Sequence, residues 1–200
     1  MHIPTTIIVM GRSGSGKGTQ IELLKEAYLK QHPGEDILYF YPGSVFRNIA
    51  QSGSHTGAKI KEDTERGVLV PDFITNGLFV GEMIEKVASG DQLFIFDGYP
   101  RNHNQMEVLE KVLRYYGREH AVVLHIKVSE EEVRARMASR GRYDDQDAEV
   151  LENRMHYYQE QVEPVIEQYR NNNNYLVIDI DGVGDINDIH HDIMEKLASV

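Results

Sequence analysis

Five short apolar runs alternate along the chain with longer segments of helical periodicity, and this alternation limits the possible folds more than any other feature. Apolar runs of this length, bounded by turn residues, are typical of strands that are buried on both faces. Strands that alternate with helices form a parallel sheet with helices on both faces. We therefore predict an α/β fold with strands at Thr6–Met10, Ile37–Tyr41, Leu93–Phe96, Ala121–Val128 and Tyr175–Ile180.

The predicted helices fill the intervals between these runs. Five of them occupy Gly18–Lys30, Gln105–Tyr116, Glu130–Ser139, Ala148–Tyr169 and Ile186–Ala198. The interval between the second and third strands differs, because about fifty residues of helix-like sequence, from Ser44 to Ser89, are too many for a simple crossover. We interpret this interval as an inserted helical subdomain.

Composition narrows the chemistry that the chain can perform. Its 200 residues, of which 40% are hydrophobic, suffice for one domain with its own core. The absence of cysteine excludes disulfides, thiolate zinc sites and cysteine nucleophiles. A net charge of -11 disfavours a nucleic-acid partner, and the first residues make a poor signal peptide. We expect a cytoplasmic protein without a membrane segment or structural zinc, and a monomer is the default expectation.

A glycine-rich segment directly follows the first predicted strand and opens the first predicted helix. It reads Gly11-Arg12-Ser13-Gly14-Ser15-Gly16-Lys17-Gly18-Thr19 and contains the G-x-x-x-x-G-K pattern of a nucleotide phosphate loop. Glycines let backbone N–H groups approach phosphate oxygens closely, and Lys17 adds a cation for the outer phosphates. Thr19 offers a hydroxyl to Mg²⁺, although the strict pattern places this hydroxyl directly after the lysine and Gly18 intervenes here. We predict that this loop binds nucleotide phosphates.

Further motifs follow in order along the chain. Gly16-Lys17-Gly18-Thr19-Gln20, joined with Asp97-Gly98-Tyr99-Pro100-Arg101, resembles the adenylate kinase family of nucleoside monophosphate kinases. Phe46-Arg47 and Gly67–Asp72 resemble that family's monophosphate-binding (NMP-binding) insert, and Arg140-Gly141-Arg142-Tyr143-Asp144-Asp145 resembles a very short lid. The resemblance spans nearly the whole chain and implies the P-loop NTPase fold. It places the insert at about residues 42–73, the lid at about 139–145, and the core at 1–41, 90–138 and 146–200.

The resemblance also implies roles for individual residues. ATP, as the phosphoryl donor, would contact Gly11, Ser13, Gly14, Ser15, Gly16, Lys17, Gly18, Thr19, Arg136, Arg140 and Gly184. AMP, as the acceptor, would contact Gly43, Arg47, Val68, Leu69, Val70, Gly98, Tyr99, Arg101, Gln105, Arg142 and Arg154. Catalysis would depend on Lys17, Arg47, Arg101, Arg140, Arg142 and Arg154. Mg²⁺ would be held by Thr19 and, through water, by Asp97, and Asp144 and Asp145 would help to order the metal's water.

The residue types suit phosphoryl transfer between two nucleotides. A guanidinium group binds phosphate bidentately and stays charged at any working pH. Asp97 ends an apolar strand beside the phosphate loop and is placed to hold Mg²⁺ through its waters, with helix capping as the alternative. For Arg136, the alternative to a contact with ATP is an ion pair with a glutamate on the same helix. For Asp144 and Asp145, the alternative to a role at the metal is an acidic turn exposed to solvent. No general base is required, since a phosphate acceptor oxygen is already ionised.

The identity of the acceptor depends on fewer residues. Gln105 matches the glutamine that recognises adenine in the family, and an amide can both donate and accept at the edge of the base. Pro42-Gly43-Ser44 departs from the family's Thr-Gly-Asp, so the threonine hydroxyl that would touch the base is missing. AMP is the favoured acceptor, with two ADP as products, while UMP, CMP or a broader set remain alternatives. A non-catalytic nucleotide sensor and simple ATP hydrolysis are more distant alternatives.

Overall fold

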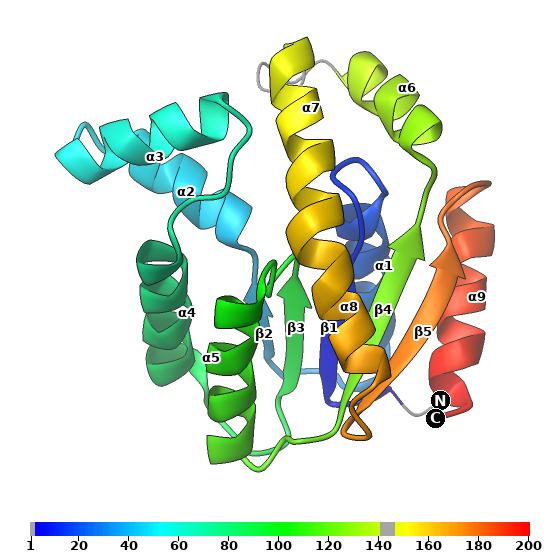
Figure 1. The fold of residues 1–200 in the computed structure, drawn as a ribbon. Coiled ribbons are helices and arrows are strands. Elements are labelled where there is room, and N and C mark those ends of the chain that lie inside the picture. Colours follow the sequence, from blue (N-terminus) through cyan, green and yellow to red (C-terminus); the bar gives the residue numbers. More distant parts are fainter. Residues whose placement is uncertain (1–2, 141–146) are drawn as a thin grey trace.

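The computed structural model describes residues 3–140 and 147–200 and contains a five-stranded parallel sheet (Figure 1). The strands are β1 (Thr6–Met10), β2 (Ile37–Phe40), β3 (Leu93–Asp97), β4 (Ala121–Lys127) and β5 (Tyr175–Asp181). Their order across the sheet is β2-β3-β1-β4-β5, and every neighbouring pair is parallel. The predicted fold class is confirmed, and each strand begins at the residue expected from its apolar run.

Strand β1 lies at the centre of the sheet between β3 and β4. Val9 of β1 pairs with Asp97 of β3 on one side and with Leu124 of β4 on the other. Because the strands are parallel, their carboxyl ends share one edge of the sheet. The loops that follow β1 and β3 therefore meet at this edge, although they are far apart in the sequence.

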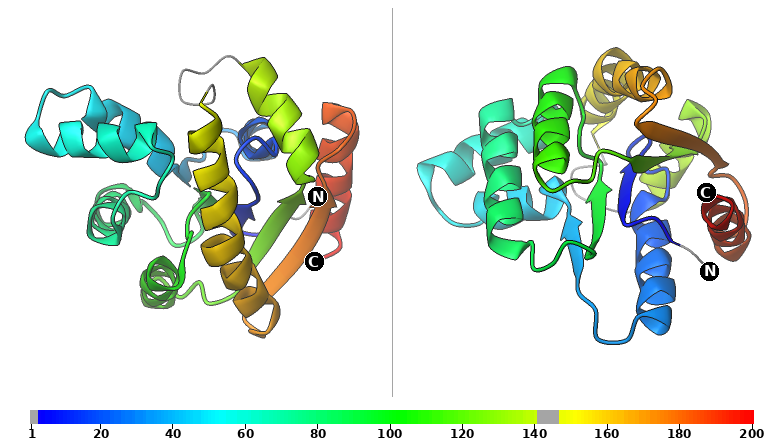
Figure 2. Two further views of the ribbon diagram at one scale, coloured as in Figure 1. Left: turned by 45° about the horizontal axis from the view of Figure 1, so that its top comes forward. Right: turned by 90° about the horizontal axis from the view of Figure 1, so that it is seen from below.

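Helices cover both faces of the sheet. Seen from below, α4, α5 and α8 lie on one side of the sheet, and α1 and α9 lie on the other (Figure 2). These helices are α1 (Lys17–Gln31), α4 (Asp72–Lys86), α5 (His103–Tyr115), α8 (Glu163–Arg170) and α9 (Ile186–Ala198). Side chains alternate along each strand, so Ile7 packs in one core with Leu24 and Leu197, whereas Ile8 packs in the other with Leu109 and Ile166.

The interval between β2 and β3 holds three helices. Helices α2 (Pro42–Ala50) and α3 (His55–Glu65) precede α4 and project away from the sheet (Figure 1). They have a small core of their own, in which Phe46, Ile60 and Val70 are buried. The loop that links α3 to α4 reaches α7 (Ala148–Tyr157), where Asn153 Nδ2 donates a hydrogen bond to the carbonyl of Arg66 at 2.7 Å.

The long helix predicted over Ala148–Tyr169 is interrupted in the structure. Helix α7 passes into a π-helical segment, η2 (Tyr158–Val162), before α8 begins at Glu163. Pro164 explains the interruption, because it has no N–H to donate and its ring collides with the carbonyl four residues earlier. The wider turn accommodates this collision without ending the helix.

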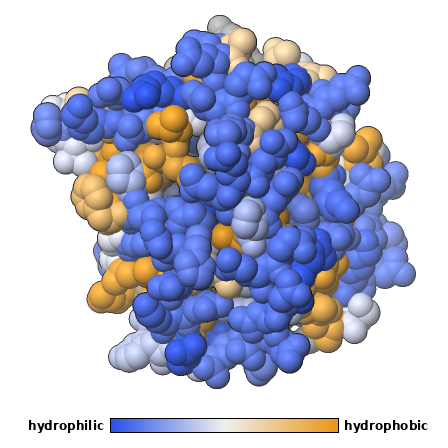
Figure 3. Space-filling model, viewed as in Figure 1, coloured by the Kyte–Doolittle hydropathy of each residue, from blue (hydrophilic) through white to orange (hydrophobic). Residues whose placement is uncertain are grey.

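The surface drawn from the side of Figure 1 is mainly hydrophilic, with apolar side chains in small separate groups (Figure 3). This distribution agrees with the net charge of -11. Within residues 3–140 and 147–200, no helix combines the length and the apolar character needed to cross a bilayer. Helix α6 comprises Glu130–Arg140.

Gly67→Ala should destabilise the protein more than Gly53→Ala. Both glycines have positive φ angles, 69° and 70°, at which an alanine costs about 1–2 kcal/mol. A Cβ atom at position 67 would also lie 2.5 Å from the carbonyl oxygen of Val150 in α7, whereas a Cβ at position 53 would meet no atom within 4 Å. Urea unfolding of the two variants measures the difference in the free energy of unfolding. Equal losses would contradict tight packing of the α3–α4 loop against α7.

Candidate functional site

Two adjoining cavities lie at the edge of the sheet where the parallel strands end. The larger one, of about 850 Å³, is lined by the phosphate loop, Asp97 and Arg136. The smaller one is lined by residues of α2, by the α3–α4 loop and by Gln105 of α5. Residues that line both cavities are Ser13, Tyr41, Gly98, Arg101 and Tyr157. The arrangement offers two binding spaces with a common boundary.

The phosphate loop has the geometry that its glycines predict. Gly11 has a φ angle of 148°, and a Cβ atom there would lie 2.5 Å from the carbonyl oxygen of Ile126, so no larger residue fits. Gly16, at φ 94°, directly precedes the first residue of α1, Lys17. The helix therefore directs its N-terminal N–H groups and the positive end of its dipole into the larger cavity. Lys17 Nζ donates to the carbonyls of Gly11 and Arg12, each at 2.9 Å.

Arg12 fixes the phosphate loop to α8, a role that the sequence did not indicate. Its Nη2 atom donates to Glu163 Oε1 at 3.0 Å, and its guanidinium carbon lies 4.6 Å from the centre of the Tyr158 ring. Both partners belong to the α7–α8 region around the π-helical turn. The loop is thus held from one side by β1 and from the other by this helix.

Asp97 lies at the bottom of the larger cavity, at the end of β3. Its side chain is 4% exposed, and its Oδ2 atom accepts a hydrogen bond from the Tyr39 hydroxyl at 2.9 Å. Burial and the Asp97 carboxylate together raise the pKa of Tyr39 well above its usual value, so this hydroxyl remains a donor. Thr19 is exposed and lines the same cavity.

These two groups fit Mg²⁺, which is bound in such sites by one or two protein oxygens while phosphates and water supply the other ligands. Among the described residues, no group of three or more acidic or histidine side chains gathers at one point. The described residues therefore do not form a metal site from protein ligands alone.

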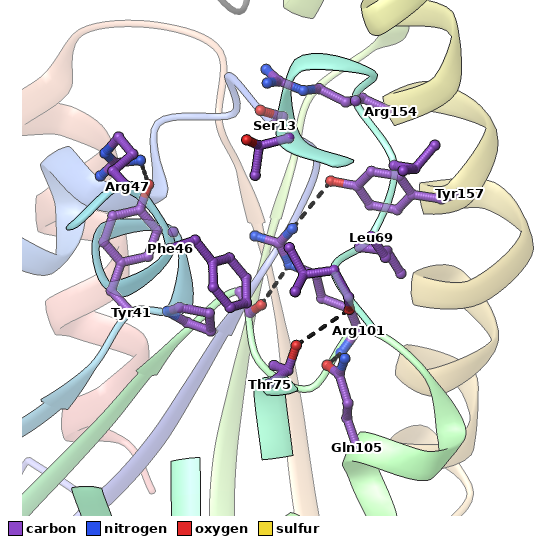
Figure 4. A pocket seen from close by; sticks show the side chains of 17 residues that line it. Ser13, Tyr41, Phe46, Arg47, Leu69, Thr75, Arg101, Gln105, Arg154 and Tyr157 are labelled. Atoms are coloured by element: carbon purple, nitrogen blue, oxygen red, sulfur yellow. Dashed lines mark hydrogen bonds between the residues drawn. The ribbon is translucent and has the colours of Figure 1, made fainter. Parts of the chain in front are cut away.

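Arg101 stands at the boundary between the two cavities (Figure 4). Its Nε atom donates to the carbonyl of Gly98 at 2.8 Å, and its Nη1 atom lies 3.3 Å from the Tyr157 hydroxyl. Arg47, on α2, lies over the ring of Tyr41 with its guanidinium carbon 5.3 Å from the ring centre. Arg154 of α7 lines the smaller cavity from the other side. Three arginines from different elements thus surround one space.

Gln105 lies deep in the smaller cavity and is 2% exposed. Its Oε1 atom accepts a hydrogen bond from the backbone N–H of Arg101 at 2.9 Å, and its Nε2 atom donates to Asp72 Oδ1 at 2.9 Å. Gly43 and the segment Val68–Val70 line the same cavity. Thr75 also lines it, with its hydroxyl donating to the carbonyl of Val70.

The structure does not bring every predicted residue to the cavities. Tyr99 is buried in the core against Phe40 and Phe79, and its hydroxyl donates to Asn76 at 2.9 Å. Ser15, although it is part of the phosphate loop, is buried, and neither Ser15 nor Gly184 lines either cavity. The described structure includes the backbone of Arg140 but not its side chain, and the predictions for Arg142, Asp144 and Asp145 fall outside the described residues.

Arg136 makes the helical pairing that its sequence context allows and also lines the larger cavity. Its Nε atom donates to Glu132 Oε1 at 2.8 Å, which is the helical pairing expected one turn away. Its Nη2 atom donates to the carbonyl of Gly182 at 2.9 Å, and the residue lines the larger cavity. The pairing therefore holds the guanidinium at the cavity.

Several tyrosines belong to the site although none of them was predicted from the sequence to be a site residue. Tyr39 bonds to Asp97, Tyr41 contacts Arg47, and Tyr157 contacts Arg101. An aromatic residue beside an apolar run is the normal pattern of a core position, so local sequence carries little sign of such contacts. The position of Tyr41, directly before the helical interval that begins at Pro42, is the sequence feature that could have indicated a role at the site.

Comparisons with known proteins agree with this geometry. The family model for adenylate kinase matches residues 9–174. The chain is 34% identical to an adenylate kinase of Nocardia farcinica over 193 residues, covering 96% of this chain and 98% of the relative. It is 34% identical to an adenylate kinase of Thermobifida fusca over 196 residues, with 96% and 98% covered, and 33% identical to one of Bacteroides thetaiotaomicron over 200 residues, with 96% and 97% covered. The chain belongs to the adenylate kinase family.

Proposed function

We propose that the protein transfers the γ-phosphoryl group of ATP reversibly to AMP and thereby forms two ADP. The observation that carries this proposal is the pair of cavities that meet at Arg101, one built on the phosphate loop and the other on an amide-bearing pocket. Phosphoryl transfer needs donor and acceptor phosphates in line, and a common boundary lined by arginine supports this alignment. Membership of a family of nucleoside monophosphate kinases supports the same reaction.

The larger cavity is the proposed ATP site. The N–H groups of the phosphate loop would bind the phosphates, and Lys17 would leave the loop carbonyls to bind the outer ones. Arg136 would contact the donor at the rim of this cavity. Thr19 and Asp97 would hold Mg²⁺, directly and through water, and the ion would supply charge neutralisation between the phosphates.

The smaller cavity is the proposed AMP site. Arg47, Arg101 and Arg154 would bind the acceptor phosphate, because guanidinium groups suit its geometry and charge. Gln105 and the backbone of Val68–Val70 would recognise the base. The acceptor oxygen is already ionised at neutral pH, so positioning and electrostatic stabilisation would carry the rate without a general base.

We also propose the family's division of the chain for this protein. The insert would comprise residues 42–73 and the lid residues 139–145, with the lid excluding water from the transferring group. Arg140 and Arg142 would then close over that group, Asp144 and Asp145 would order the metal's water, and Gly184 would approach the donor base. A cytoplasmic monomer that acts on small nucleotides alone completes the proposal.

A coupled assay with Mg·ATP should show preference for AMP over UMP, CMP and GMP. The physical reason is the side-chain amide of Gln105 in the smaller cavity, which can both donate to and accept from adenine. Lys17→Met serves as the blank and should lower kcat by about a hundredfold or more, since it removes a charge that stabilises the transferring group. Comparable rates on several acceptors would establish broad specificity. Nucleotide binding without turnover would indicate a sensor, and phosphate release without an acceptor would indicate hydrolysis.

Arg101→Ala should lower kcat/KM for AMP by about 10- to 150-fold, the equivalent of the 1.5–3 kcal/mol that hydrogen bonds to a charged group contribute. The KM for ATP should change far less, because the phosphate loop is built from other residues. Arg114→Ala is the matched control, since Arg114 is exposed on α5 and pairs with Glu119 away from both cavities. Steady-state kinetics with each substrate varied in turn measures both effects. Equal losses of kcat/KM for AMP in Arg101→Ala and Arg114→Ala would contradict the proposal that Arg101 binds the acceptor phosphate.

A further inference from the structure

Asp72 has three amide donors around its carboxylate although it carries no role in the proposed chemistry. It is the first residue of α4, and its donors come from α5 and from the residue that caps α5. Asn102 Nδ2 donates to Oδ1 at 2.8 Å, Gln105 Nε2 donates to Oδ1 at 2.9 Å, and Asn104 Nδ2 donates to Oδ2 at 3.1 Å. Burial alone would raise the pKa of Asp72, but these hydrogen bonds outweigh it and hold the pKa below its usual value. The group is therefore an ionised acceptor at neutral pH.

The two partners of Gln105 determine which way its side-chain amide points. The backbone N–H of Arg101 can only donate, so the atom facing it must be the amide oxygen. The Asp72 carboxylate can only accept, so the atom facing it must be the amide nitrogen. Turning the amide by 180° would set donor against donor and acceptor against acceptor. The orientation thus follows from chemistry at both ends of the group.

The fixed amide keeps one hydrogen-bonding position at each end. An amide oxygen has two acceptor positions and an amide nitrogen has two donor hydrogens, and within the described residues one of each is used. Adenine offers an acceptor at N1 beside a donor at its 6-amino group. Hypoxanthine offers the reverse, a donor at N1–H beside an acceptor at O6. An amide free to turn would pair with either base, whereas a fixed amide pairs with only one of them.

We propose that Asp72 is a positioning residue that fixes the orientation of the Gln105 amide and thereby makes the smaller cavity selective for a 6-amino purine monophosphate over a 6-oxo one. The proposal rests on the proposed function, in which this cavity holds the acceptor nucleotide. Asp72 acts through Gln105 and needs no contact with the base. Selectivity of this kind comes from the pattern of donors and acceptors, because the two nucleotides have nearly the same size.

The test compares binding of AMP and IMP by calorimetric titration of the protein without ATP. The wild-type protein should bind AMP more tightly, and Asp72→Ala should reduce the ratio of the two dissociation constants by about fivefold, because only the Arg101 N–H then remains to orient the amide. Asn104→Ala is the matched control, because it removes a donor from the same carboxylate and leaves the contact with Gln105 in place. Its ratio should equal that of the wild type.

A second comparison separates positioning from general loosening of the site. In a Gln105→Ala background, Asp72→Ala should leave the AMP to IMP ratio unchanged, because the amide through which it acts is gone. If Asp72→Ala fails to fold, Asp72→Ser keeps a small polar residue at the start of α4 and replaces it in every comparison.

The outcomes bear on the two proposals separately. Three results would overturn the role of Asp72 and leave the proposed reaction untouched. The first is an unchanged ratio of the AMP and IMP dissociation constants in Asp72→Ala, and the second is an equal reduction of this ratio in Asn104→Ala. The third is a reduction by Asp72→Ala that is just as large in the Gln105→Ala background. Selective binding of AMP that depends on Asp72, combined with no phosphoryl transfer to AMP, would overturn the proposed reaction and support the positioning role. Absence of AMP binding to the wild type would overturn both.

Discussion

The hydrogen-bonded pairing of β1 with β3 is the constraint on which the site depends. Val9 and Asp97 are partners in this ladder, so the phosphate loop that follows β1 and the Gly98–Arg101 loop that follows β3 are held at one edge of the sheet. Both strands are buried on both faces, and this burial makes the register costly to shift, because a slip of one residue would exchange the side chains around which the two cores are closely packed. The distance between the two loops is therefore a property of the core.

The groups that join the two cavities come from elements that are distant in the sequence. Arg101 follows β3, Tyr157 ends α7, and Arg47 lies on α2, yet they surround one space (Figure 4). The α7–α8 region contributes twice, since Arg12 of the phosphate loop is held by Glu163 and Tyr158 around the π-helical turn. A change in this helix would thus reach both the phosphate loop and Arg101. Helices α2 and α3, with their own small core, add the opposite wall of the smaller cavity.

The sequence predicted the strands, the phosphate loop and the helical character of the interval between β2 and β3 because each depends on local periodicity or on a short motif. It missed the tyrosines of the site, since Tyr39, Tyr41 and Tyr157 resemble packing residues until their partners are known. It placed Tyr99 at the acceptor site, where the structure instead buries its side chain among Phe40 and Phe79. The predicted helix over Ala148–Tyr169 is helical in the structure but contains a π-helical turn at Tyr158–Val162, for which Pro164 gave a sign in the sequence.

The sequence by itself determined the sheet, the position of the glycine-rich phosphate loop and the supply of arginines, because glycine conformation, apolar runs and charge are properties of each residue and its close neighbours. Only the tertiary structure decided which arginine stands between the cavities and how the Gln105 amide points. The orientation of Gln105 depends on a backbone N–H four residues away and on a carboxylate at the start of another helix. Hydrogen bonds between elements exist only once the core has brought those elements together, so no local pattern encodes them.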